Sequence, residues 1–302
     1  MTTVGFIGLG SMGLPMARNL LNRGFAVRGF DVKAGSLTAL EQAGGTSAAD
    51  AADAARGAGV LVLMVVNAAQ ADAVLFDAGA AAALSPGGVV ILMATCPPGT
   101  VAALAAKVEA AGRRFLDAPV SGGVVGAVAG SLTIMAAGAP ATYAAARPVL
   151  EAMGQRLFHV GEQPGQGAAV KTVNQLLCGV HIAVTAEAFA LAAKAGVDPA
   201  VLLEIMGGSS AASWMLKDRG PRMLEAEPHV TSAVDIFVKD LGIVLEAGRE
   251  AKAALPLAAA AHQMFLATSG RGEGAMDDSQ VIRSYHAVNG THPGGTRPGG
   301  AA

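Results

Sequence analysis

The sequence predicts an α/β protein in which a doubly wound, mostly parallel sheet is followed by an all-α domain, with a long helix shared between them. Three observations lead to this fold class. From Thr3 to about His159, short apolar runs rich in valine and isoleucine alternate with alanine-rich helical stretches, as in βαβ units. After Pro164 only helical patterns follow. Hydrophobic residues make up 52% of the chain and charged residues 15%, which favours strands buried on both faces.

Six apolar runs in the first half are predicted to be strands. Each is separated from the next by a stretch that can cross over the sheet, so parallel pairing is expected. The runs, in chain order, are TVGFIG at 3–8, AVRGFD at 26–31, GVLVLMVV at 59–66, GGVVILMAT at 87–95, FLDAPV at 115–120 and LTIMAAG at 132–138.

The second half is predicted to be helical, with helices at about 168–196, 199–207, 211–225, 232–251 and 256–269. No flexible linker separates the halves, so the first of these helices should belong to both. The predicted domains are 1–163 for the sheet domain, 164–286 for the helical domain, and 287–302 for a glycine- and proline-rich tail. The tail has little to bury and is expected to be disordered, and no function is assigned to it.

Charge and cysteine usage exclude several classes of protein. The net charge is −2 and the basic residues are scattered, so a nucleic-acid partner is not expected. Two distant cysteines fit a reducing cytoplasm and lack the spacing of a zinc site. The N-terminus does not resemble a signal peptide. The longest apolar stretch, 170–193, is interrupted by charged and strongly polar side chains, so we predict no membrane span: Lys171, Asn174, Gln175, His181 and Glu187.

The stretch GFIGLGSMGLPMARNL contains Gly8, Gly10 and Gly13 in the pattern G-x-G-x-x-G, between a predicted strand and a predicted helix. In this context the first glycine makes the turn, the second lets a pyrophosphate approach, and the third packs helix on strand. The helix N-terminus supplies unpaired N–H groups to the phosphates. The pattern therefore predicts a dinucleotide site of the Rossmann type, with Leu9, Ser11 and Met12 in the same loop.

Asp31 ends the next strand, at a spacing where an acidic side chain accepts hydrogen bonds from the ribose 2′-hydroxyl and repels a 2′-phosphate. This favours NAD over NADP. The alternative is an ordinary turn followed by a solvated aspartate.

Further strand ends should lie along the same edge of the sheet, where ligands bind in such folds. They contribute Val66 and Asn67 from one strand, and Thr95 from the next. Thr95 is equally compatible with ordinary loop chemistry. The segment DAPVSGG at 117–123 ends in Ser121, Gly122 and Gly123, whose backbone N–H groups could hold a carboxylate, although a plain turn gives the same pattern.

Lys171 lies in a predicted helix that is covered on nearly all sides, where an ammonium is costly unless it is matched. Burial disfavours the charged form, and an amine near neutrality can exchange a proton with a hydroxyl. Asn174 and Gln175 fall on the same helical face. Gly165 and Gly167, one turn earlier, are expected to leave room for a ligand. The alternative is a lysine that extends to the surface.

Other charged residues carry a weaker signal. Asp235 and Lys239 stand at i and i+4, which by spacing alone is an ordinary helix ion pair. Five of the six histidines show no metal-ligand spacing among them, so no metal site is predicted: His159, His181, His229, His262 and His286.

With these motifs assembled, the chain resembles the β-hydroxyacid dehydrogenase family, which includes 3-hydroxyisobutyrate dehydrogenase, over all but the tail. Four family signatures match in order: GFIGLGSMGLPMARNL, DAPVSGG, GQGAAVKTVNQ and DIFVKDL. The resemblance implies that Lys171 is the catalytic lysine, Asn174 its companion, and Ser121–Gly123 the binders of the substrate carboxylate. It also implies that Thr95 and Lys239 contact the cofactor on its nicotinamide side.

Within this family, the stretches at 176–196, 213–224 and 232–248 look most like the L-threonate dehydrogenase branch. This implies NAD-dependent oxidation of L-threonate to 2-oxo-tetronate in the cytoplasm by a homodimer or homotetramer. Activity as a 3-hydroxyisobutyrate dehydrogenase or as a tartronate or succinate semialdehyde reductase is the alternative. A dinucleotide-sensing binding protein without turnover is the alternative from another class.

Overall fold

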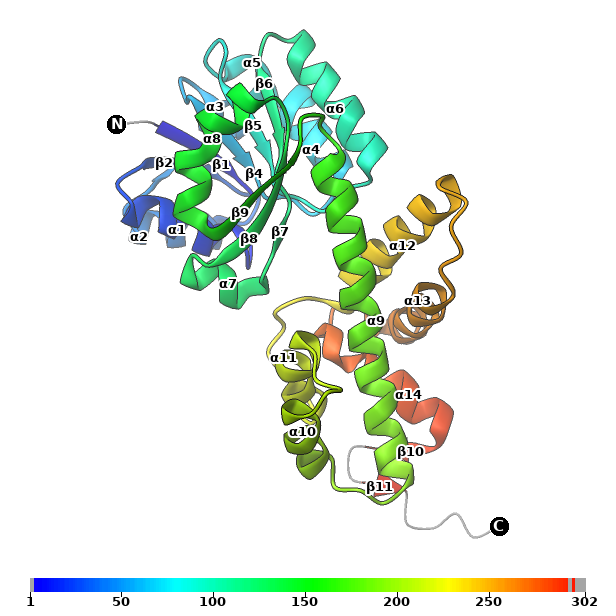
Figure 1. Ribbon diagram of the computed structural model, residues 1–302. Coiled ribbons are helices and arrows are strands. Elements are labelled where there is room, and N and C mark those ends of the chain that lie inside the picture. The colour runs from blue at the N-terminus through cyan, green and yellow to red at the C-terminus, as the bar shows by residue number, and fades with distance from the viewer. Residues whose placement is uncertain (1–2, 293–294, 297–302) are drawn as a thin grey trace. The chain divides into compact units, whose positions relative to one another are not determined.

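The computed structural model describes residues 3–292 and 295–296, and the chain divides into two compact units, Met1–Thr172 and Val173–Ala302 (Figure 1). The long helix α9, Gln166–Lys194, passes through the division. The boundary thus falls inside the shared helix rather than before it, because the first turns of α9 pack on the sheet: Ala168 belongs to the core of the first unit.

The first unit is a twisted sheet with the strand order β3-β2-β1-β4-β5-β6-β8-β7, and β9 pairs with β8. The pairs from β3 through β6 are parallel, whereas β8 runs antiparallel to β6 and β7. The strands are β1 Thr3–Ile7, β2 Ala26–Phe30, β3 Thr46–Ser47, β4 Val60–Leu63, β5 Val89–Leu92, β6 Arg114–Asp117, β7 Val120–Ser121, β8 Leu132–Ala137 and β9 Gly154–Gly161.

Helices cover both faces of this sheet (Figure 1). Alternate residues of β4 point into opposite cores: Val60 and Val62 into one, Leu61 and Leu63 into the other. This is why the strands appear in the sequence as continuous apolar runs. The helical elements are α1 Gly13–Asn22, α2 Ala34–Gln42, α3 Ala51–Ala55, α4 Ala68–Asp72, the π-helical η1 Ala73–Asp77, α5 Ala80–Ala83, α6 Pro98–Ala110, α7 Gly123–Ala129 and α8 Pro140–Met153.

The second unit packs helices around one apolar core. Beside the later part of α9 these are α10 Pro199–Gly208, α11 Trp214–Met223, α12 Val234–Glu250, α13 Pro256–Thr268, the π-helical η2 Ser269–Glu273, the 3₁₀ turn η3 Asp278–Val281 and α14 Ile282–Asn289. Two short strands, β10 Thr291–His292 and β11 Gly295–Thr296, pair antiparallel.

Several sequence predictions need correction here. The short β3 and β7 and the strand β9 were not anticipated, because two-residue strands carry no periodicity and only one of the eight residues of β9 is buried. Helix α14 was also missed. It continues to Asn289, and β10 and β11 follow it, so regular structure extends into the segment expected to be a disordered tail. The rest of that segment, 293–294 and 297–302, lies outside the described residues.

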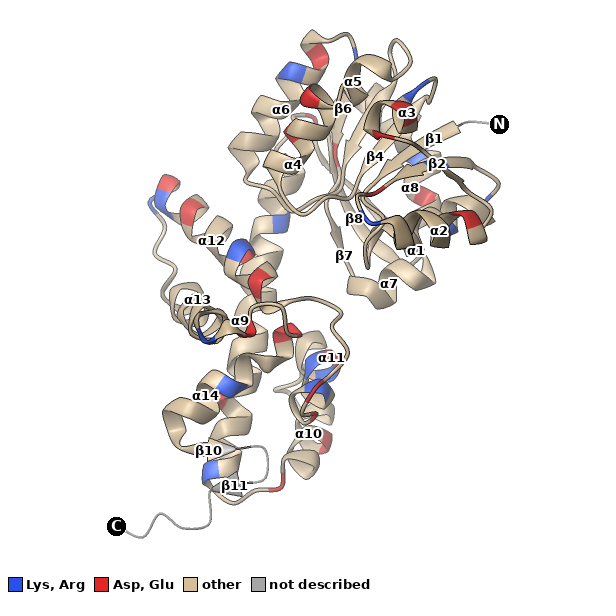
Figure 2. Ribbon diagram, turned by 180° about the vertical axis from the view of Figure 1, so that it is seen from behind, with Lys and Arg blue, Asp and Glu red and all other residues tan. Residues whose placement is uncertain are grey.

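Charged residues of both signs occur in both units (Figure 2). In the second unit, Arg219 is buried and binds both carboxylate oxygens of Asp278, each at 2.9 Å, while Arg222 lies 3.5 Å from Asp277. This ion cluster ties α11 to the turn that precedes α14. By length and composition alone α9 could cross a membrane, but half of its most apolar window is buried against the protein.

Candidate cofactor and catalytic site

The three glycines of the first motif have three separate physical roles. Gly8 has φ +92°, and a Cβ there would lie 2.3 Å from the carbonyl oxygen of Met64. A Cβ on Gly13 would lie 1.8 Å from the carbonyl oxygen of Gly8, so this glycine lets α1 start directly on the turn. A Cβ on Gly10 would meet nothing within 4 Å. No protein neighbour explains Gly10, which fits a position kept open for a ligand.

The loop also presents donors. Among the described residues, no hydrogen bond is formed by the backbone N–H groups of Gly10, Ser11 and Met12, which precede the first residue of α1. Unpaired N–H groups at a helix N-terminus suit a phosphate. Leu9 differs, because its N–H donates to Asp31 Oδ2 at 2.7 Å and its side chain is buried. The loop therefore fits a pyrophosphate.

Asp31 directly follows β2 and is held at both carboxylate oxygens. Besides Leu9, the N–H of Lys33 donates to Oδ1 at 2.8 Å. These bonds hold the negative charge next to the glycine loop, which suits a ribose with a free 2′-hydroxyl and disfavours a 2′-phosphate.

The next two strand ends differ in what they offer. After β4, the Asn67 side chain accepts from the N–H of Gln70 and caps α4, while Val66 N–H donates to the side chain of Gln70. The fold therefore uses the Asn67 oxygen to shape this loop, and Val66 remains half-exposed. Thr95 follows β5 and is partly buried. Both segments lie at the carboxyl edge of the sheet, where the glycine loop also lies.

Ser121 ends β7 opposite Thr133 of β8, and Gly122 and Gly123 follow with φ of +129° and +60°. Both φ values lie in the region that residues other than glycine rarely adopt. α7 begins at Gly123 without a side-chain cap, so no capping side chain satisfies its first N–H groups. These features match the carboxylate site predicted at Ser121–Gly123, which we call the carboxylate cradle. That it binds a carboxylate stays a prediction.

Lys171 lies in the second turn of α9, and 7% of its surface is exposed. The alternative of a lysine extending to the surface is therefore wrong. Gly165 and Gly167 leave no room for a ligand, contrary to expectation. A Cβ on Gly165 would lie 2.8 Å from the carbonyl oxygen of Pro98, and a Cβ on Gly167 would lie 2.4 Å from that of Met135. Gly165 instead lets the start of α9 pack against α6, to which Pro98 belongs, and Gly167 lets it pack against β8 of the sheet.

The sequence reasoning missed Asp117, which is completely buried at the end of β6. Its Oδ2 accepts from the N–H groups of Gly165 at 3.1 Å and Ala168 at 2.8 Å. Burial raises the pKa of Asp117 to about 6, against the opposing effect of these N–H groups. An acidic residue directly after the apolar pair Phe115 and Leu116 was the available signal.

In the second unit a chain of polar contacts connects Asn174 with Lys239. The Asn174 amide donates to Gln175 at 2.8 Å, Gln175 donates to Asp240 at 2.5 Å, and Lys239 pairs with the other oxygen of Asp240. Lys239 thus pairs with its neighbour in sequence, and Asp235, four residues earlier, accepts from Ser269. Asp240, with 2% exposure, is a second residue that spacing alone did not identify.

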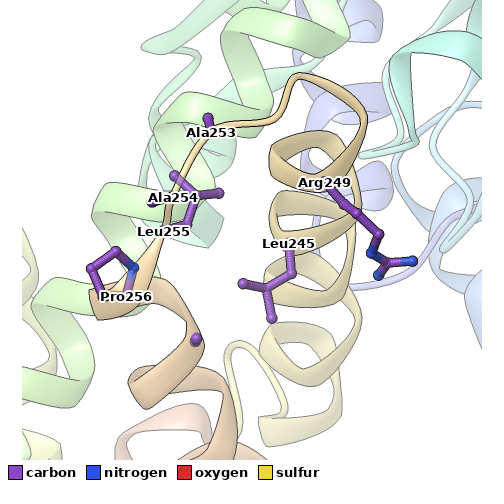
Figure 3. A pocket seen from close by; sticks show the side chains of 7 residues that line it. Leu245, Arg249, Ala253, Ala254, Leu255 and Pro256 are labelled. Carbon is purple, nitrogen blue, oxygen red and sulfur yellow. The ribbon is translucent and has the colours of Figure 1, made fainter.

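The second unit also contains an open, largely apolar cavity of about 450 Å³, where α12 turns into α13 (Figure 3). Leu245 points toward the loop before α13, whereas the Arg249 guanidinium is turned away from Leu255. None of the predicted site residues lines this cavity. The lining residues are Leu245, Arg249, Ala253, Ala254, Leu255, Pro256 and Ala259.

Comparison with known proteins agrees with this geometry. Residues 3–161 match the family model of the NAD binding domain of 6-phosphogluconate dehydrogenase, and residues 165–285 match the NAD-binding domain of NADP-dependent 3-hydroxyisobutyrate dehydrogenase. The chain belongs to the 3-hydroxyisobutyrate dehydrogenase-related family. Together the two matches cover both units, which confirms the resemblance predicted from the four signatures.

Individual relatives cover nearly the whole chain. An L-threonate dehydrogenase from Cupriavidus necator is 45% identical over 286 residues, covering 94% of this chain and 96% of that protein. The Escherichia coli K12 L-threonate dehydrogenase is 39% identical over 293 residues, covering 96% of each chain. The crystal structure of a 3-hydroxyisobutyrate dehydrogenase from Salmonella typhimurium superimposes with a TM-score of 0.90 at 40% identity, covering 94% of this chain and 99% of that one.

The protein is therefore an NAD-dependent dehydrogenase that acts on the CH–OH group of a small hydroxy acid. This agrees with the fit of the glycine loop and Asp31 to NAD. It also decides against a binding protein without turnover.

Proposed function

We propose that this dehydrogenase oxidises L-threonate at C2 to 2-oxo-tetronate, with Lys171 as the general base. The observation that carries the base assignment is the burial of Lys171 on a helix whose start is clamped to the sheet. The L-threonate dehydrogenases among the relatives support the substrate assignment.

The residues of the chain have separate tasks in this proposal. Gly8–Gly13 hold the pyrophosphate of NAD and Asp31 its adenosine ribose, while Val66, Asn67 and Thr95 line the same edge. When bound, NAD supplies the hydride acceptor. The N–H groups at Gly122 and Gly123 and the hydroxyl of Ser121 hold the substrate carboxylate. This leaves the reacting hydroxyl for Lys171.

Lys171 accepts the hydroxyl proton in its neutral form as the carbinol is oxidised, and its ammonium form returns that proton in the reverse direction. Burial favours the neutral amine, since an ammonium loses its hydration there. Asn174 follows Lys171 by three residues on the same helix and is proposed to orient the substrate hydroxyl. For Lys239 we propose a contact with the nicotinamide side of the cofactor, in which Asp240 orients its ammonium.

A screen of hydroxy acids with NAD tests the substrate assignment. L-threonate, D-glycerate, 3-hydroxyisobutyrate and 4-hydroxybutyrate are compared by the appearance of NADH absorbance. We expect kcat/KM to be highest for L-threonate by roughly tenfold or more, about 1.4 kcal/mol of transition-state discrimination. A higher value for 3-hydroxyisobutyrate would favour the second candidate function, which is the activity named for the Salmonella typhimurium structure.

We further propose a cytoplasmic homo-oligomer, a homodimer or homotetramer. Four apolar side chains on the later part of α9 are each at least half exposed: Val173, Leu177, Val184 and Leu191. The apolar helix α10 has no buried residue. Such a face is typical of an interface between copies of a chain. Light scattering of the purified protein would measure its mass in solution.

A further inference from the structure

Asp117 and Lys171 are the two charged side chains that are buried among the described residues of the first unit. They stand on the two chain segments that meet at the start of α9. The proposed function uses Lys171 and leaves Asp117 without a task. A buried carboxylate is costly, so its presence needs a reason.

The contacts of Asp117 show what it does locally. Oδ2 receives the N–H groups of Gly165 and Ala168, which are orphan donors at the N-terminus of the 29-residue α9. Oδ1 is buried and has no hydrogen-bond partner among the described residues. A Cβ on Gly167 would lie 3.0 Å from Oδ2, so the glycine permits this close approach. The carboxylate thus clamps the start of the helix to the end of β6.

The two segments held by this clamp both lead to the proposed site. Along α9, Lys171 follows Ala168 by three residues, about 4.5 Å of helix rise. Along the other segment, Ser121 follows Asp117 by four residues. That segment is held on both sides, because Ala118 N–H donates to Leu92 of β5 and the Pro119 carbonyl accepts from Met135 of β8. The clamp is therefore a direct connection between the segment that carries the base and the segment that leads to Ser121–Gly123.

We infer that Asp117 is a positioning residue for the reaction: by binding the first N–H groups of α9 it sets where Lys171 stands relative to Ser121–Gly123. This inference rests on the proposed function of Lys171. Loss of the clamp lets the helix start move away from the sheet, and a displacement of about 1 Å can lower a catalytic rate by roughly 100-fold.

The surroundings of Asp117 make its ionisation a useful readout. β5 and β8 carry no ionisable side chain. On α9 the buried Lys171 follows Ala168 by three residues. On β6, α6 and α8, charged groups have partners of their own: Arg114 donates to Gly87, Lys107 of α6 pairs with Asp72, and Arg147 of α8 pairs with Glu151. Glu109 of α6 is exposed. With its pKa near 6, the carboxylate gains a proton below that pH and loses its attraction for the helix N-terminus.

The test uses the reduction of 2-oxo-tetronate by NADH, in which Lys171 acts as an ammonium, so its own protonation does not lower the rate at acid pH. In the wild type, kcat should fall below pH about 6 as Asp117 is protonated. Asp117→Asn should lower kcat by roughly 10- to 100-fold at pH 7. The substitution should also abolish the fall of kcat at acid pH, which is the acid limb of the pH profile, and leave KM and the NADH dissociation constant nearly unchanged.

Gly167→Ala breaks the same clamp from the helix side and should give a similar loss of kcat, so the inference does not depend on Asp117→Asn folding. Two control variants should keep wild-type kcat. Asp198→Asn changes an aspartate that caps exposed α10 through two N–H groups, and Gly35→Ala places a Cβ in open space.

The outcomes separate the two proposals. Lys171→Ala with retained turnover would overturn the proposed base, whatever Asp117 does. If Lys171→Ala is inactive while Asp117→Asn and Gly167→Ala keep kcat within twofold, only the positioning role is wrong. A merely structural role for Asp117 predicts a lower melting temperature with an unchanged acid limb, and that result would also overturn the inference.

Discussion

Asp117 in the first unit and Asp278 in the second are both completely buried, but the protein satisfies them differently. Arg219 neutralises Asp278 through two hydrogen bonds, whereas Asp117 faces only backbone N–H groups and keeps one oxygen without a described partner. Burial raises the pKa of both carboxyls, and only Asp278 has a guanidinium opposing that effect. We infer that the paired carboxylate stabilises the fold and the unpaired one serves the reaction.

The largest expected effect tests the functional side of this comparison. Lys171→Ala should lower kcat by roughly 10²- to 10⁴-fold, the usual effect of a lost general base, while NADH binding is nearly retained. Steady-state kinetics and NADH fluorescence titration measure the two quantities. Lys194→Ala, on the exposed end of the same helix, is the control and should be active. Wild-type turnover in Lys171→Ala would remove the lysine from the mechanism.

Breaking the ion pair between Asp278 and Arg219 should lower the free energy of unfolding rather than the turnover of the folded enzyme. Asp278→Asn leaves the buried Arg219 without its bidentate partner, and we expect the free energy of unfolding to fall by about 3 kcal/mol. Chemical denaturation measures this. The control Arg249→Met removes an exposed pair with Glu246 and should change stability by less than about 0.5 kcal/mol. Equal effects of the two substitutions would contradict a structural role for the buried pair.

The unpaired carboxylate should give stability an unusual pH dependence. Because the pKa of Asp117 is raised in the folded state from 3.8 to about 6, folding favours its protonated form. The contribution of Asp117 to the free energy of unfolding is fully present below pH 3.8 and is lost as pH rises through about 6, a total of about 3 kcal/mol. Asp117→Asn does not titrate, so its stability relative to wild type should rise over this interval. A constant difference between the two proteins would contradict the raised pKa.

A smaller effect is expected at Asp31, a partly exposed carboxylate that lies between the two extremes. Asp31→Ser should lower the preference for NAD over NADP by roughly tenfold, about 1.4 kcal/mol, because it removes the charge that repels a 2′-phosphate. The ratio of kcat/KM for the two cofactors measures it. Asp31→Asn keeps an acceptor for Leu9 N–H and separates charge from geometry. An unchanged ratio in both variants would exclude the ribose role.

Much of the fold could be predicted from local patterns. The apolar runs place β1, β2, β4, β5, β6 and β8, because strands buried on both faces need continuous apolar residues. Helices α9 to α13 were located to within a few residues, since caps such as Ser213 at the start of α11 shift only the ends, whereas α14 was missed. The antiparallel direction of β8 was not predicted, because a short, mostly apolar run carries no sign of strand direction.

The site shows the same limit. The sequence by itself determined the glycine loop, Asp31, the burial of Lys171 and the family, because spacing along a strand or helix sets which residues can face a ligand. Only the tertiary structure decided that Gly165 and Gly167 pack the start of α9 against α6 and the sheet, that Lys239 pairs with Asp240, and that Asp117 holds the helix bearing Lys171. These depend on contacts between segments distant in sequence, such as β6 and α9, and no local pattern encodes where such segments meet.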